Sequence, residues 1–168
     1  MHAPLVSRAP LPWGDAGTWF TVRTMRRLAR SEAADPLVVG TAAYITQHAS
    51  GVLHTTLAIR RWLAGVTVFR PDPEGIELVR SPVAALLEIR EHGVLRGDCD
   101  DVAVLAAGLA LACQLPVRYR VLGWTAGGHY GHVLAEVWDG HGWIDLDVTR
   151  PQQAGMMAPP VREAAITV

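Results

Sequence analysis

The chain has 168 residues, of which 50% are hydrophobic and 18% are charged, and its formal net charge is −1 at neutral pH. This balance gives no electrostatic reason to expect binding to nucleic acid or to an anionic membrane surface. No apolar run approaches the roughly 20 residues of a membrane span, and the N-terminus lacks the pattern of a secretory signal. We therefore expect one soluble, cytoplasmic domain over residues 1–168.

The first half of the chain is predicted to be mostly helical, because apolar residues recur there at helical spacing. In chain order the expected elements are an irregular arm (1–17), a short strand (18–22), helices (25–32, 37–47 and 52–63), two extended segments (65–69 and 77–79) and a further helix (83–91). Asp35-Pro36 is suited to start the second helix, and Ser81-Pro82 is suited to cap and start the last.

The second half begins with a helix and continues as strands. In chain order we expect a buried helix (99–113), a strand (117–122), a Gly-containing loop (124–131), two strands (132–138 and 143–148) and an extended arm (150–168). The small residues of the helix allow close packing on several sides, which indicates a central position. Asp139-Gly140-His141-Gly142 is a strong signal for a hairpin between the last two strands. Helices followed by antiparallel strands predict an α+β fold.

Cys99 stands at the start of the central helix, within Gly97-Asp98-Cys99-Asp100-Asp101. We expect Asp98 to cap the helix, which leaves Cys99 among free backbone N–H groups at the positive end of the helix dipole. That position favours a thiolate, but the neighbouring aspartates oppose it, so a cationic partner such as an imidazolium is needed. Cys113 would lie roughly 20 Å away along the same helix, too far for a disulfide.

The hairpin geometry identifies that partner. A turn centred between Gly140 and His141 pairs Trp138 with Trp143 and places Glu136 opposite Asp145. Because side chains alternate between the faces of a strand, His132 then shares a face with Asp147, its diagonal neighbour. If the Cys99 helix packs on this face, a Cys99, His132, Asp147 triad follows, with His132 as the base and Asp147 fixing its tautomer. Asp145 is the alternative orienting acid.

Four motifs in this part of the chain form one pattern. In chain order they are Gly97-Asp98-Cys99-Asp100-Asp101, Leu115-Pro116-Val117-Arg118, His132-Val133-x-x-Glu136-Val137-Trp138 and Gly142-Trp143-x-x-Leu146-Asp147-x-Thr149. Together they closely resemble the transglutaminase-like superfamily of cysteine enzymes, over about residues 77–149. The family often has Pro after its aspartate, where this chain has Val148. The N-terminal part, with Asp72-Pro73-x-Gly75-x-Glu77, is similar to the small versions encoded among phage structural genes.

The resemblance implies a papain-like α+β core, with N-terminal helices and the nucleophile helix packed on a C-terminal antiparallel sheet. It also implies acyl transfer through a thioester on Cys99, resolved by water in a hydrolase or by an amine in a cross-linking enzyme. The expected substrate is a protein or peptide amide or ester, with no cofactor. The alternative is a phage-derived structural or adaptor protein, in the bacterial host cell or on the virion, that uses the same fold as a binding module.

Other residues near the triad have less specific roles. His129 and Tyr130 in the loop, and Trp138 on the hairpin, are candidates for contact with substrate, although loop packing and a pair with Trp143 explain them as simply. Asp98 and Asp101 are expected to support the site from outside it, as is Asp145 if it does not orient the histidine. Asp98, Asp100 and Asp101 leave a helix start in different directions, so no metal site is expected.

Overall fold

The computed structural model describes residues 6–9, 14–73, 76–150 and 158–168. The helices are α1 (Asp15–Glu32), α2 (Pro36–Thr46), α3 (Gly51–Val66), α4 (Pro82–His92) and α5 (Cys99–Ala112). The strands are β1 (Val6–Ala9), β2 (Thr67–Phe69), β3 (Glu77–Arg80), β4 (Leu95–Gly97), β5 (Val117–Gly123), β6 (His132–Trp138), β7 (Trp143–Asp145) and β8 (Arg162–Thr167). None of these described helices is both long and apolar enough to cross a membrane.

The strands of the second half form one antiparallel sheet in the order β7-β6-β5-β8. Two small ribbons lie elsewhere: β1 pairs with β3 in antiparallel orientation, and β2 pairs with β4 in parallel orientation. This mixture of leading helices and a C-terminal antiparallel sheet confirms the predicted α+β class.

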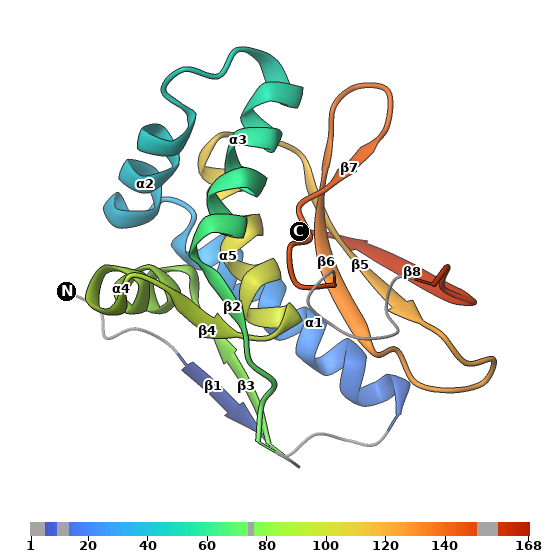
Figure 1. The fold of residues 1–168 in the computed structure, drawn as a ribbon. Helices are drawn as coiled ribbons and strands as arrows, with labels where there is room; N and C mark the ends of the chain where they lie inside the picture. Colours follow the sequence, from blue (N-terminus) through green and yellow to red (C-terminus); the bar gives the residue numbers. More distant parts are fainter. Residues whose placement is uncertain (1–5, 10–13, 74–75, 151–157) are drawn as a thin grey trace.

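Helix α5 is the centre of the molecule and lies between the other helices and the sheet (Figure 1). It contacts α1, α2, α3 and α4, and on its other side β5 and β6. Almost every residue from Asp100 to Ala110 is buried, as its small and apolar composition predicts. A helix that is buried on all sides is held by its neighbours. The N-terminus of α5 is therefore fixed against the end of the sheet at which β6 begins.

The predicted helix starts at Asp35 and Ser81 are confirmed. The Asp35 carboxylate accepts a hydrogen bond from Leu37 N at 2.8 Å, and Ser81 Oγ accepts one from Ala84 N at 3.3 Å. The expected cap at Asp98 is wrong in its detail. Asp98 occupies the N-cap position with extended backbone, but its side chain accepts no capping hydrogen bond.

Several expected elements differ in the structure. Residues 18–22, predicted as a strand, belong to α1, because Thr21 and Val22 continue the buried helical face of Met25 and Leu28. The last strand ends at Asp145 rather than 148, and β4 was not predicted. The C-terminal segment expected to be an extended arm carries β8, which pairs with β5, and the N-terminal one carries β1.

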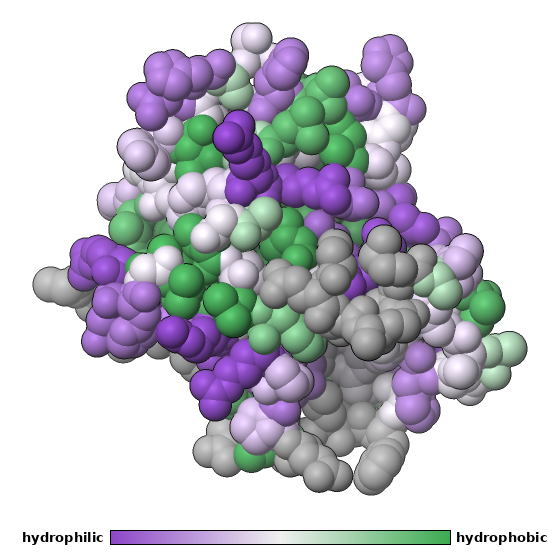
Figure 2. All heavy atoms as spheres, viewed as in Figure 1, coloured by the Kyte–Doolittle hydropathy of each residue, from purple (hydrophilic) through white to green (hydrophobic). Residues whose placement is uncertain are grey.

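On the face drawn in Figure 2, hydrophobic side chains form several separate groups divided by hydrophilic ones. The exposed large apolar residues of the helical part are few and include Val39, Tyr44, Leu53 and Leu57 on α2 and α3. Scattered exposure of this kind is normal for a folded chain.

Gly108 allows α4 to approach α5, and we expect Gly108→Ala to destabilise the protein by about 1–3 kcal/mol. An added Cβ would lie 2.7 Å from Cγ and 3.0 Å from Cβ of the rigid Pro82 ring. The clash should outweigh the gain in helix propensity of about 1 kcal/mol. The matched control is Gly40→Ala in α2, where nothing lies within 4 Å of the added atom and stability should rise. Urea unfolding of both variants tests this; a stabilised Gly108→Ala contradicts it.

Candidate functional site

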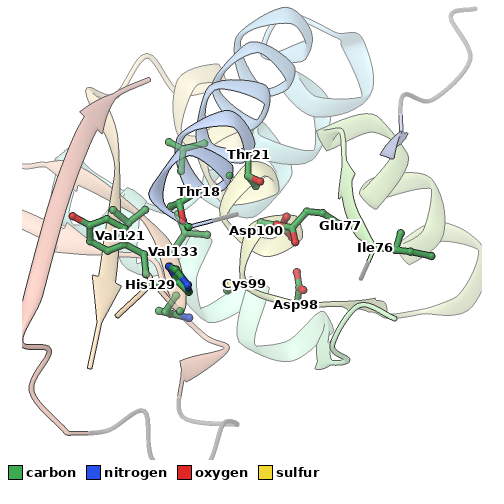
Figure 3. A pocket seen from close by; sticks show the side chains of 16 residues that line it. Thr18, Thr21, Ile76, Glu77, Asp98, Cys99, Asp100, Val121, His129 and Val133 are labelled. Carbon is green, nitrogen blue, oxygen red and sulfur yellow. The ribbon is translucent and has the colours of Figure 1, made fainter. Parts of the chain in front are cut away.

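A cavity of about 560 Å³ opens at the N-terminus of α5. Its walls come from α1, β3, the start of α5, β5, β6 and the loop before β6. Cys99 and His132 both line it, as do Asp98, Asp100, His129 and Tyr130. Figure 3 shows side chains of the sheet on one side of Cys99 and carboxyl groups on the other. Residues more than 30 positions apart in the sequence therefore meet at one thiol.

Cys99 is the first residue of α5 and is partly exposed as a whole residue. The pKa of its thiol is nevertheless raised well above the usual value, first by burial and then by the charges of Asp98 and Asp100. A backbone hydrogen bond at Val133 acts in the opposite direction but does not compensate. Burial and then the neighbouring carboxylates outweigh the helix dipole in the free protein, so a thiolate at Cys99 needs the cationic partner that the sequence predicts.

His132 begins β6, and its Nε2 lies 2.8 Å from Oδ2 of Asp147. Both side chains are buried, and His132 Nδ1 has no hydrogen-bond partner among the described residues. Because a carboxylate only accepts, a neutral His132 carries its proton on Nε2 and presents the Nδ1 lone pair. This is the tautomer that can take a proton from a thiol in the cavity.

Asp147 is held by several donors besides His132. Its Oδ1 accepts hydrogen bonds from Thr149 N at 2.9 Å, Thr149 Oγ1 at 3.1 Å and Arg150 N at 3.1 Å. Burial by itself raises the pKa of Asp147. The hydrogen bond and charge of His132, followed by the backbone donors, outweigh burial and lower it to about 2. Asp147 is thus an anion throughout the neutral range.

The predicted hairpin register is confirmed, with Trp138 opposite Trp143 and Glu136 opposite Asp145. Strand β7 ends at Asp145, Leu146 N still donates to Ala135 O at 2.9 Å, and Asp147 beyond it contacts His132. Asp145 makes ion pairs with Arg60 at 3.4 Å and Arg150 at 4.0 Å, and it does not bond His132. Of the two acids that the sequence left open, Asp147 is the one that contacts the histidine.

Asp101 supports the site from behind rather than lining the cavity. Its carboxylate accepts a hydrogen bond from Arg80 N at 2.8 Å and pairs with the Arg80 guanidinium. Burial raises the pKa of Asp101 to about 7, although the Arg80 charge and backbone bond lower it in part. The contact joins the start of α5 to the end of β3.

Three other carboxyl groups form one wall of the cavity, which we call the acidic wall: Glu77 of β3 with Asp98 and Asp100. Figure 3 shows the side chains of Glu77 and Asp100 pointing toward each other, with Asp98 close to Cys99. The pKa of Asp100 is raised well above its usual value by burial and by Asp98, and that of Glu77 is raised by burial and by Asp98. The sequence predicts no role for Glu77 in the site, because nothing local in the sequence places β3 beside α5.

The three adjacent aspartates do not diverge as expected. One carboxylate oxygen from each of Asp98, Asp100 and Asp101 lies within 4.8 Å of the others. Both oxygens of Asp101 already accept from Arg80, however, and the cavity beyond is much larger than an ion.

The three candidates for substrate contact separate into two groups. His129 and Tyr130 line the cavity, and Tyr130 packs edge-on against Trp19 with ring centroids 6.3 Å apart. Trp138 stands at the far end of β6 and pairs with Trp143 at 5.4 Å. Trp124, which sequence reasoning passed over, lies 6.2 Å from the His132 ring and shields it.

Comparison with known proteins gives one family and two structural neighbours. The sequence model of the Transglutaminase-like superfamily matches residues 39–148, about two-thirds of the chain. No protein of curated function matches. A candidate cysteine protease from Cytophaga hutchinsonii is similar in fold, with a TM-score of 0.51, 21% identity, and coverage of 73% of this chain and 38% of that one. A candidate protease from Parabacteroides distasonis has a TM-score of 0.59 at 10% identity and covers 95% of this chain and 33% of that one. The chain thus spans 38% of the length of the first neighbour and 33% of the second.

Proposed function

The chain belongs to the transglutaminase-like superfamily, and from this premise we propose that it is a thiol-dependent acyl-transfer enzyme acting on a peptide or protein. Cys99 is the nucleophile, His132 is the acid and base, and Asp147 orients His132. The observation that carries the proposal is the 2.8 Å contact of His132 Nε2 with Asp147, which leaves Nδ1 without a hydrogen-bond partner among the described residues, in a histidine that lines the same cavity as Cys99.

The steps follow from this tautomer. The Cys99 proton moves to His132 Nδ1 as the sulfur attacks the amide or ester carbonyl, and the free N–H groups at the start of α5 stabilise the oxyanion. His132 then gives the proton to the leaving amine or alcohol, and a thioester remains on Cys99. Water or an amine attacks the thioester carbonyl and loses a proton to His132. The C–S bond then breaks, the acyl group leaves as a carboxylic acid or an amide, and His132 returns the proton to the Cys99 sulfur.

Acylation by p-nitrophenyl acetate tests the proposal, because this small uncharged ester needs no substrate recognition. We expect release of nitrophenol and an acetyl group on the peptide that contains Cys99, with Cys113 unmodified as the internal control. Cys99→Ala should abolish the modification, and His132→Ala should slow it by about 10²-fold or more. Adding hydroxylamine or glycine ethyl ester as acceptor shows whether water or an amine resolves the thioester.

The alternative function, a structural or adaptor protein, predicts the opposite result. A structural or adaptor protein that uses this fold as a binding module does not need an assembled thiol and imidazole. Equal, slow acetylation of Cys99 and Cys113, unaffected by His132→Ala, would sink the enzymatic proposal and direct the search to a binding partner.

A further inference from the structure

Among the described residues, the acidic wall has no cationic Arg or Lys side chain beside it in the cavity. Neither Arg nor Lys is among the described residues that line the cavity, and the chain contains no lysine at all. The other titratable groups that face this space are His129, His132, Tyr130 and the Cys99 thiol, and none of them balances three carboxyl groups.

Asp100 shows most directly that a partner is missing. It is only 3% exposed, and neither of its carboxylate oxygens has a hydrogen-bond partner among the described residues. Its neighbours are the carboxyl groups of Asp98 and Glu77, which can hydrogen-bond to Asp100 only when one member of the pair is protonated and cannot donate when ionised. A buried carboxylate without donor or cation is costly, and burial therefore raises the pKa of Asp100 and of Glu77.

Two features argue that the missing partner is organic rather than a metal ion. Asp101, the third member of the compact aspartate group, is already neutralised by Arg80. The remaining carboxyl groups line a cavity of about 560 Å³ that also holds Cys99 and His132, which is room for part of a peptide. A group that binds there is placed beside the thiol.

We propose that Glu77, Asp98 and Asp100 bind a positively charged group of the acyl donor, an ammonium or guanidinium, next to the carbonyl that Cys99 attacks. The inference rests on the proposed function, whose substrate class it narrows to cationic peptides. Asp98 and Asp100 flank Cys99 in the chain, so the charge sits within about one residue of the attacked carbonyl.

Binding of this cation also activates the nucleophile. Asp98, Asp100 and Glu77 are the charges that oppose ionisation of Cys99 in the free protein. A bound cation offsets them, so the Cys99 proton can pass to His132 Nδ1 and leave a thiolate beside an imidazolium. The Cys99 thiol therefore stays protonated and weakly nucleophilic until a positively charged substrate binds.

Alkylation of Cys99 by iodoacetamide, an uncharged reagent, tests this on the wild-type protein. The probe is n-butylguanidinium chloride, and the matched uncharged control is n-butylurea at equal ionic strength. At about pH 8 we expect the cation to accelerate alkylation of Cys99 by about tenfold in a saturable way, with no effect of the urea and none on Cys113. No acceleration, or equal acceleration by the urea, overturns the proposal, and acceleration by Ca²⁺ alone assigns the wall to a metal instead.

Two isosteric variants make the test specific to the acidic wall. Glu77→Gln and Asp98→Asn should each raise the alkylation rate without cation and reduce the response to n-butylguanidinium. If the response persists unchanged in the double variant, the cation acts elsewhere and the assignment is wrong.

Peptide substrates then separate this inference from the proposed function. Donor peptides that differ only in arginine against citrulline should differ in kcat/KM by about tenfold or more, and N-terminal acetylation shows whether a side chain or the terminal amine is recognised. If p-nitrophenyl acetate acylates Cys99 but the cation has no effect, the proposed acyl-transfer activity is supported and the proposed cation site is wrong. If the cation accelerates alkylation of Cys99 but no acyl transfer occurs, the cation site is supported and the proposed enzymatic activity is wrong.

Discussion

Asp147→Asn is expected to lower the rate of acyl transfer by about 10³–10⁴-fold while the protein stays folded. The reason lies in the donors around the carboxylate. Thr149 and Arg150 present three donors to Oδ1, so the asparagine must place its carbonyl oxygen there. Its NH₂ group then faces His132 Nε2, which has to become an acceptor. The ring proton moves to Nδ1, and the base that Cys99 needs is lost.

The measurement is the acetylation rate of Cys99 by p-nitrophenyl acetate, with urea unfolding as the check on structure. The matched control is Asp145→Asn, two residues away on the same hairpin, which weakens partly exposed ion pairs with Arg60 and Arg150. It should retain activity within about threefold, because Asp145 does not bond His132 and partly exposed pairs contribute little. A large loss in Asp145→Asn with little loss in Asp147→Asn would reverse the assignment of the orienting acid.

The hairpin shows how much of the site the sequence could predict. The turn fixes the register, because Asp139 Oδ1 accepts from His141 N at 2.8 Å and Gly142 N at 2.7 Å and closes the loop at one length. From that register the alternation of side chains brings His132 and Asp147 to one face. The two side chains are in contact although β7 ends at Asp145, with His132 at the start of β6 and Asp147 two residues past the end of β7.

The electrostatic state of Cys99 could not be predicted from the sequence. It depends first on the burial of the thiol, and in smaller part on Glu77, which reaches the cavity only because β3 packs beside α5. Reasoning from the local sequence identified the helix dipole and the adjacent aspartates. It could not predict that the thiol and Asp100 are buried, and burial is what strengthens the effect of those charges. Likewise, the pairing of β8 with β5 depends on a segment some 40 residues away, and no turn specifies it.

Arg80→Gln is expected to destabilise the protein by about 3 kcal/mol at pH 8 and much less at pH 5. Arg80 supplies the charge for Asp101, whose side chain is fully buried, and also approaches Glu88 at 3.4 Å. The pKa of Asp101 is raised to about 7 in the folded state. Below about pH 5, Asp101 is therefore protonated in the folded protein, and the Arg80 guanidinium has no carboxylate charge to stabilise there. Above pH 7 it is ionised, and without Arg80 it must either keep its proton or remain buried as an unpaired charge.

The sign of the pH dependence is the sharper test. A carboxyl group whose pKa is raised on folding favours the folded state most at low pH, and this contribution is lost as pH rises from about 4 to about 7. Removal of Arg80 raises that pKa further, so the variant should keep losing stability above pH 7, where the wild type levels off. Urea unfolding at about pH 5, 7 and 9 measures the difference, with Arg60→Gln, which breaks a partly exposed pair, as the control that should change by less than about 1 kcal/mol at every pH. A loss of stability in Arg80→Gln that is equal at all three pH values would show that Arg80 acts by packing alone. The charge of Asp101 would then not be what joins β3 to the start of α5, where Cys99 stands.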